Sequence, residues 1–77
     1  MKVVISHIRA FTMAGQAAEV KRSLIDPYFE GISEKAIHQW AESVVRAFDL
    51  RGWSYSMASD TFRFEPKVIA KTGHACF

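Results

Sequence analysis

The segment 33–52 constrains the fold more than any other part of the chain. Five apolar residues in it follow the i, i+3, i+4, i+7, i+11 spacing of one helical face: Ile37, Trp40, Ala41, Val44 and Phe48. Charged and polar residues dominate the opposite side. Ser33 can cap the N-terminus, and Gly52 can end the helix in the left-handed conformation. The pattern predicts an amphipathic helix that buries one stripe.

The part of the chain before this segment predicts one strand and one further helix. Residues 2–11 are rich in β-branched side chains and contain neither glycine nor proline, which favours a strand. Residues 12–25 carry a second helical stripe, formed by Met13, Ala17, Val20 and Leu24. Pro27 ends this helix, because the residue before a proline avoids the α region.

The part after Gly52 predicts a β-hairpin. Large apolar side chains alternate with polar ones in residues 53–57 and 61–65, on either side of the turn-like segment 58–60. Pro66 ends the second strand or lies on its edge. The tail 68–77 is apolar for a chain end, and three interpretations stay open. It forms a last strand on the sheet's own edge, or a strand added to another copy or a partner, or a loose tail.

The predicted elements combine into one α+β domain of residues 1–77. Their order is β-α-α-β-β, with a final strand left open. Each helix has one stripe to bury, and the hairpin has one apolar face that can cover both stripes. We therefore predict a largely antiparallel sheet with two helices packed on one face.

Composition limits the classes of function. Cys76 is the single cysteine, so no disulfide forms within the chain, which fits a reducing compartment and predicts a cytoplasmic protein. The net charge of +2 is too small to indicate nucleic-acid binding by itself. No apolar run approaches the roughly 20 residues of a membrane span, and the start lacks the pattern of a signal peptide. We expect no membrane association.

Motifs for metal binding and catalysis are missing from the sequence. The candidate metal ligands other than carboxylates are His7, His38, His74 and Cys76, and their spacing matches no structural zinc pattern. Cys76 lies near a chain end, where a rigid catalytic orientation is hard to supply. The glycines are isolated, so neither a phosphate-binding loop nor a dinucleotide fingerprint is present. We expect a protein that is not an enzyme and has no cofactor.

Two segments carry candidate partner-binding residues. Tyr28 and Phe29 are adjacent aromatics in a short connection and either close the end of the helix pair or anchor a partner. In the apolar tail, Val68, Ile69 and Phe77 are the candidates for contact with another chain.

Nucleic-acid binding is the alternative function, and the basic side chains that could contact the nucleic acid are Arg51, Arg63, Lys67 and Lys71. The hairpin aromatics near them could stack on bases, but the predicted helices need the same aromatic face as a cover, which favours a core. A winged-helix layout, with 33–50 as recognition helix, also fits the order helix, helix, hairpin. The mixed charge of that helix would not attract phosphate strongly.

The sequence thus favours a small protein that acts by direct protein–protein contact, as an inhibitor, adaptor or accessory subunit. A bacterial or phage regulator of a host or defence complex is one concrete form of this hypothesis. The alternatives are the winged-helix-like nucleic-acid regulator and a homo-oligomeric structural protein whose strand edges pair between copies, the simplest being a homodimer.

Overall fold

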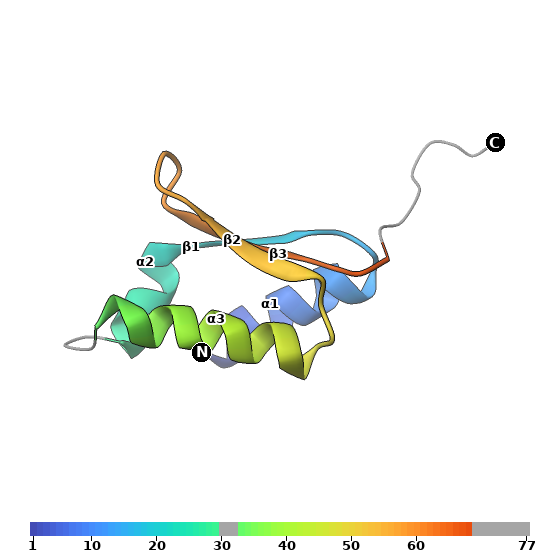
Figure 1. The fold of residues 1–77 in the computed structure, drawn as a ribbon, viewed down its shortest axis with the longest axis horizontal. Coiled ribbons are helices and arrows are strands. Elements are labelled where there is room, and N and C mark those ends of the chain that lie inside the picture. The colour runs from blue at the N-terminus through green and yellow to red at the C-terminus, as the bar shows by residue number, and fades with distance from the viewer. Residues whose placement is uncertain (30–32, 69–77) are drawn as a thin grey trace.

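The computed structural model describes residues 1–29 and 33–68, which form two layers (Figure 1). A three-stranded antiparallel sheet makes one layer, and the helices lie on one of its faces. The elements are α1 (Lys2–Met13), β1 (Ala18–Lys21), α2 (Arg22–Ile25), the 3-10 turn η1 (Asp26–Tyr28), α3 (Glu34–Ala47), β2 (Gly52–Ser56) and β3 (Thr61–Glu65). The predicted α+β class is confirmed, although the order of its first elements is not.

β3 is the central strand of the sheet, whose order is β1-β3-β2. Phe62 of β3 lies opposite Val20 of β1 and Tyr55 of β2. Because β3 has a neighbouring strand on each side and helices over one face, Phe62 and Phe64 are only 1% and 0% exposed. The centre of the sheet is therefore also the centre of the core.

The core fills the space between the sheet and the helices. Its buried apolar residues are Val4, Ile8, Ala18, Val20, Ile25, Ile37, Ala41, Val44, Leu50, Phe62 and Phe64. Trp40 of α3 stands edge-on to Phe62 and Phe64, at ring-centroid distances of 6.5 and 5.8 Å. For Trp40, this confirms the predicted packing of the 33–52 stripe against the apolar face of the hairpin.

α3 confirms the helix predicted in the segment 33–52, with corrections at both ends. Ser33 occupies the N-cap position in an extended conformation, but its side chain makes no capping hydrogen bond. The left-handed residue after the helix is Asp49, with a φ of 52°, and not Gly52. Leu50 N–H donates to the Val45 carbonyl at 2.9 Å, so the chain has left the helix before the glycine, which begins β2.

The strand predicted for residues 2–11 is wrong, because this segment belongs to α1. Val4, Ile8 and Thr12 recur every four residues and are buried along one face of the helix. The Thr12 hydroxyl donates to the Ile8 carbonyl at 2.8 Å, which satisfies its polar group within the helix. Burial of this face against the sheet outweighs the β propensity of the branched side chains.

The helix predicted for residues 12–25 is also wrong, because most of this segment is a turn and a strand. Gly15 has a positive φ of 76°, a conformation that glycine adopts without strain and that ends the helical geometry after α1. Buried Ala18 and Val20 then alternate with exposed side chains and form β1. Pairing of this segment with β3 outweighs its four-member helical stripe.

Only the last residues of the helix predicted for 12–25 are helical, and they form the short turn α2, which η1 follows. Pro27 lies in the first turn of η1 and not beyond a helix end. Met13 and Leu24, which the predicted stripe assigned to the core, are exposed.

The predicted β-hairpin is confirmed as β2 and β3. Residues 57–60 turn the chain, and Asp60 takes a positive φ of 52°. β3 ends at Glu65, directly before Pro66, as predicted. Residues 67–68 are in no strand, and residues 69–77, on which the rest of the tail prediction falls, lie outside the described residues.

Candidate protein-binding groove

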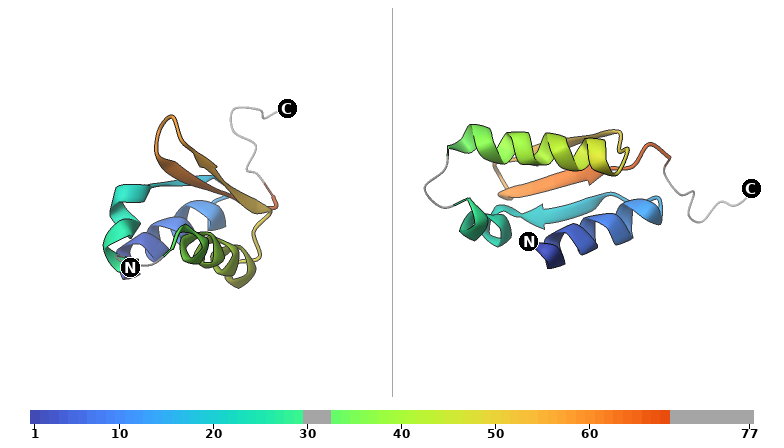
Figure 2. Two further views of the ribbon diagram at one scale, coloured as in Figure 1. Left: turned by 60° about the vertical axis from the view of Figure 1, so that its left-hand side comes forward. Right: turned by 90° about the horizontal axis from the view of Figure 1, so that it is seen from below.

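A groove runs along the outer edge of β1, where α1, β1 and the turns α2 and η1 meet. In Figure 2, α1 lies beside β1 at this edge of the sheet. The cavity has a volume of about 330 Å³ and mostly apolar walls. Its lining residues are Val3, Val4, His7, Glu19, Val20, Leu24 and Tyr28. We call it the β1 groove.

Large apolar side chains are exposed around the β1 groove. Val3, Leu24 and Tyr28 are 82%, 58% and 54% exposed. Phe11, 40% exposed, packs its ring against His7 with 4.6 Å between centroids, so it extends the apolar surface along α1. The other exposed large apolar side chains in the described part of the chain are Met13, Met57 and Val68. Three of these seven exposed side chains therefore line one groove, and Phe11 lies beside it through its contact with His7.

One wall of the β1 groove is the flank of α1. His7 Nε2 lies 3.2 Å from the Glu19 carbonyl oxygen at the outer edge of β1. A carbonyl oxygen only accepts, so the ring nitrogen is the donor. Val4 and Ile8 of the same helix are buried against the sheet. Together these contacts leave Val3 and His7 facing outward over β1.

The opposite wall, made by α2 and η1, is fixed by Arg22. Its guanidinium pairs with Asp26 at 3.2 Å and with Glu34 at the start of α3. It also lies 6.0 Å from the ring centroid of Tyr55. Hydrogen bonding to Glu34, and then to Tyr55 and Asp26, raises the pKa of Arg22 above its usual value. The two short turns are thereby joined to both α3 and the hairpin.

The candidate partner-binding residues of the sequence lie in different places. Tyr28 lines the β1 groove. The adjacent Phe29 is half-buried and lies edge-on to Trp40, with 6.0 Å between ring centroids. Val68 is exposed and lines a second groove, while Ile69 and Phe77 lie outside the described residues.

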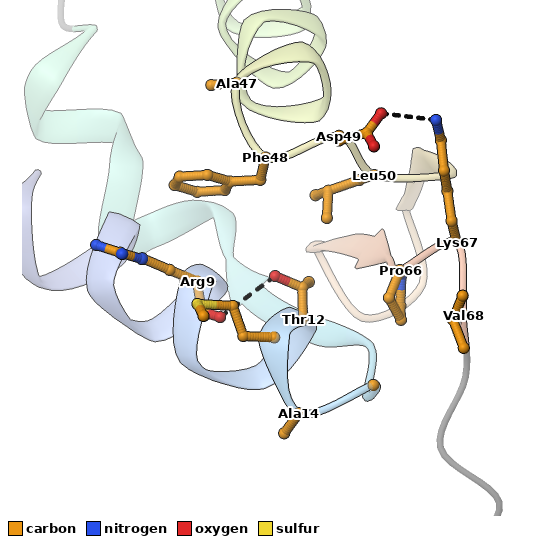
Figure 3. Close-up of a pocket in the computed structure, with 12 residues that line it drawn as sticks. Arg9, Thr12, Ala14, Ala47, Phe48, Asp49, Leu50, Pro66, Lys67 and Val68 are labelled. Carbon is orange, nitrogen blue, oxygen red and sulfur yellow. Dashed lines mark hydrogen bonds and ion pairs between the residues drawn. The ribbon is translucent and has the colours of Figure 1, made fainter.

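The second groove lies between the C-terminal ends of α1 and α3 (Figure 3). Its volume is about 740 Å³, and Arg9, Phe48, Lys67 and Val68 are among its lining residues. Lys67 Nζ pairs with Asp49 Oδ1 at 2.6 Å across its rim. This groove is wider and more charged than the β1 groove, and it holds a single candidate partner-binding residue.

Two of the basic residues proposed for nucleic-acid contact are paired with carboxylates. Arg63 pairs with two carboxylates on the open face of the sheet, at 2.9 and 3.6 Å. Lys67 pairs with Asp49, as described above. Arg51 is exposed before β2, and Lys71 lies outside the described residues.

The hairpin aromatics face the helices and not the solvent. Phe62 and Phe64 are buried, and Trp53 and Tyr55 are half-buried. The Trp53 indole N–H donates to Glu42 Oε1 of α3 at 2.8 Å. The core interpretation of these side chains is confirmed, and Phe62 and Phe64 have no face available for stacking on bases.

The described residues contain no cluster of three or more His, Cys, Asp or Glu side chains placed to bind a metal ion. His7 is bonded to the Glu19 carbonyl, and His38 lies with its ring centroid 5.2 Å from that of Trp53. His74 and Cys76 lie outside residues 1–29 and 33–68. Within those ranges no helix has both the length and the apolar character needed to cross a membrane.

Sequence reasoning missed most of the β1 groove. Val3, His7 and Phe11 are spaced by four residues and form a row on α1, next to the buried row that begins at Val4. Reading residues 2–13 with helical spacing would have revealed both rows. Leu24 gave no comparable signal, because its exposure depends on the turns that follow β1.

Comparisons of the chain with protein-family models, curated proteins and solved structures find no match. The surfaces of the molecule are therefore the basis for inferring its function.

Proposed function

We propose that the protein is a small, non-enzymatic binding domain that contacts a partner protein through the β1 groove. The observation that supports this best is the gathering of exposed Val3, Leu24 and Tyr28 at one groove, with Phe11 stacked on His7 beside it. Contiguous apolar surface is unfavourable in water and, on soluble domains, commonly marks a contact site for another protein. Tyr28 adds an aromatic ring with a polar end, a side chain that is frequent at the centre of interfaces.

The lining of the β1 groove favours a protein segment over a small polar ligand. A small-molecule site usually has a few polar groups that converge on the ligand. Here the two ionisable groups other than Tyr28 are engaged within the protein, His7 with the Glu19 carbonyl and the Glu19 carboxylate with Arg63. The partner that fits this lining inserts one or two large apolar side chains from an exposed segment.

Such a contact suits an inhibitor, adaptor or accessory subunit, including a bacterial or phage regulator of a host or defence complex. A chain of 77 residues has a thin core and acts most readily by occupying a surface of something larger. Its single cysteine, Cys76, fits a site of action in the reducing cytoplasm.

The test compares capture of a partner by matched variants. Leu24→Lys places a charge in the β1 groove, and Met57→Lys places the same charge on the hairpin turn, at a side chain that is 86% exposed. Tagged wild-type and variant proteins are incubated with nuclease-treated lysate, the captured protein is identified, and its affinity is measured with purified components. We expect Leu24→Lys to abolish the defined complex and Met57→Lys to preserve it, while circular dichroism shows both variants folded.

Equal affinity of both variants would contradict the β1 groove as the contact surface. Capture that disappears with nuclease would instead support nucleic-acid binding. A wild-type dimer in solution that Leu24→Lys converts to a monomer would make the partner a second copy of this chain.

A nucleic-acid regulator is the second candidate, because one structural observation favours it. The described elements follow the order helix, strand, helix, helix and hairpin with strand order β1-β3-β2, which is the layout of winged-helix domains. The turn 57–60, which would be the wing, contains Asp60 and no basic residue. Layout alone does not establish activity. Retention of duplex DNA that falls steeply with salt would support this candidate.

A further inference from the structure

The two edges of the sheet differ in how their backbone groups are directed. Arg22 N–H donates to the Asp60 carbonyl at 2.9 Å, which continues the β1–β3 ladder by one hydrogen-bonded pair. Hydrogen-bonded pairs alternate along an antiparallel ladder, so Phe62 and Phe64 direct their backbone groups toward β1. Arg63, between them, pairs with Ser54 of β2 instead. By the same alternation, Trp53 and Tyr55 direct their N–H and C=O groups out of the sheet.

The outer edge of β1 is blunted against further pairing. Its strand has four residues and leads at once into α2. His7 occupies the Glu19 carbonyl, and exposed Lys21 stands on the same strand. Short length, an edge lysine and a covering side chain are devices that protect a strand edge.

The outer edge of β2 has fewer of these protections. The strand Gly52–Ser56 contains no charged residue and no proline. Its one irregularity is at the start, where Arg51 N–H donates to the Glu65 carbonyl although the register pairs Glu65 with Gly52. From Trp53 onward the pairing is regular. In the described residues, β2 therefore offers two outward-facing peptide groups as a template for another strand.

The side chains beside this edge are fixed in place. Trp53 is bonded to Glu42, and its ring centroid lies 5.2 Å from that of His38. Tyr55 donates its hydroxyl hydrogen to the Asp60 carboxylate. Both rings are half-buried, so an added strand would meet a rigid aromatic border and lose little of its binding energy to ordering it.

The charged side chains along the β2 edge indicate which kind of strand could pair with it. Lys35, His38, Glu42 and Arg46 share one exposed flank of α3, and Glu42 and His38 on that flank contact Trp53. The Glu42 carboxylate already accepts the indole hydrogen bond. Lys35, Arg46 and Arg51 take part in none of the ion pairs of the described residues. The border of the β2 edge thus carries three basic side chains against the carboxylates of Glu42 and Asp60, a net charge of +1.

We propose that β2 accepts an extended, acidic segment of a partner protein as a fourth strand. A second copy of this chain fits less well, because its own β2 border is equally basic. It would also bring a second α3 under the neighbouring strand, about 4.8 Å away, whereas packed helices lie about 8–10 Å apart. α3 lies below the sheet in Figure 1 and in front of β2 in the right-hand view of Figure 2, which is seen from the helical side. An isolated extended strand with acidic side chains is not repelled by the basic residues and brings no second helix.

This surface lies on the opposite edge of the sheet from the β1 groove and does not depend on the function proposed for that groove. The probe is a short synthetic peptide in which Glu alternates with Val, compared with a peptide that has Lys in place of each Glu. Amide hydrogen exchange and NMR shifts are measured on the folded protein with and without each peptide.

We expect the acidic peptide to raise the protection of the Trp53 and Tyr55 amides, while the Ser54 amide, which already faces β3, changes little. Arg46→Glu with Arg51→Glu should weaken binding about tenfold, and the matched double change Lys2→Glu with Arg9→Glu on α1 by less than about twofold. The alternation of protected amides is a readout that non-specific charge attraction does not produce.

Several results would overturn the proposal. One is protection of Trp53 and Tyr55 in the free protein, since the edge would then already be paired. Others are no change at these amides with millimolar acidic peptide, equal binding of the Lys peptide, or an equal effect of the two double variants. Changes confined to residues 18–21 would move strand addition to β1, and a peptide-independent dimer that protects β2 would make the occupant a second copy.

Discussion

Replacing Phe62 tests the architecture of the core most directly. Its ring is 1% exposed and lies 4.8 Å from the Tyr55 ring, 5.7 Å from Trp53 and 6.5 Å from Trp40, measured between centroids. Truncating a buried Phe to Ala costs about 3–5 kcal/mol. A chain of 77 residues has a free energy of unfolding of about 4–12 kcal/mol. Phe62→Ala therefore removes a large share of the stability, and Phe62→Leu, which keeps much of the volume, should cost about 1–2 kcal/mol.

The assay is urea unfolding, followed by tryptophan fluorescence and by far-ultraviolet circular dichroism. Trp40 and Trp53 both border Phe62, so the fluorescence reports on the site that is changed. The control Met57→Ala removes a side chain that is 86% exposed and should change the free energy of unfolding by less than about 0.5 kcal/mol. If Phe62→Leu and Met57→Ala unfold at the same urea concentration, Phe62 is not central to the core and the sheet order β1-β3-β2 is wrong.

Three further changes test other parts of the molecule. Phe48 is only half-buried at the rim of the second groove, so Phe48→Ala should cost about 1–3 kcal/mol in urea unfolding, less than a fully buried Phe; a loss as large as that of Phe62→Ala would contradict its placement. Arg22→Met should lower the melting temperature, because Arg22 joins α2 to α3 and the hairpin, and an unchanged melting curve would show that these contacts add nothing. The hydrogen bond to Asp60 raises the pKa of Tyr55 above its ordinary value of 10.0; that bond stabilises the fold below about pH 10 and its contribution is lost as the pH rises through the folded pKa. In a Tyr28→Phe background the ultraviolet titration of Tyr55 should shift to lower pH on Asp60→Asn, and an identical titration would exclude the bond.

The C-terminal half of the fold could be predicted from the sequence because its patterns have a single interpretation. The α3 stripe from Ile37 to Val44 fits only a helix, and the alternation around Phe62 fits only a strand. The helix end could not be located, since Asp49 adopts the left-handed conformation that Gly52 was expected to supply. A local backbone choice of this kind depends on contacts that follow the turn, such as that of Leu50 with the core.

The N-terminal half could not be predicted, because local propensity and tertiary burial disagree there. Residues 2–11 have the composition of a strand, but burial of Val4 and Ile8 makes them helical. Residues 18–21 are too short for a periodic signal, and their strand exists because β3 supplies a partner for it. Of the candidate site, Tyr28 was named from the sequence together with Phe29, and the role of the pair as core or as partner anchor stayed open. The structure places Tyr28 at the β1 groove and Phe29 against Trp40.

The failed part of the prediction coincides with the β1 groove for a physical reason. α1 carries two adjacent rows of residues. The row that begins at Val4 is buried in the core, and the row that begins at Val3 is exposed to solvent. A helix that only supported the core would need the first row alone, and its sequence would then show the polar face by which amphipathic helices are detected. The second row, in which His7 lies between Val3 and Phe11, narrows the polar face to Lys2, Ser6 and Arg9, and the segment then resembles a strand with apolar residues on both sides. Val3 and Phe11, which obscure the helix in the sequence, are exposed and do not belong to the core, and the partner contact that we propose would account for their presence.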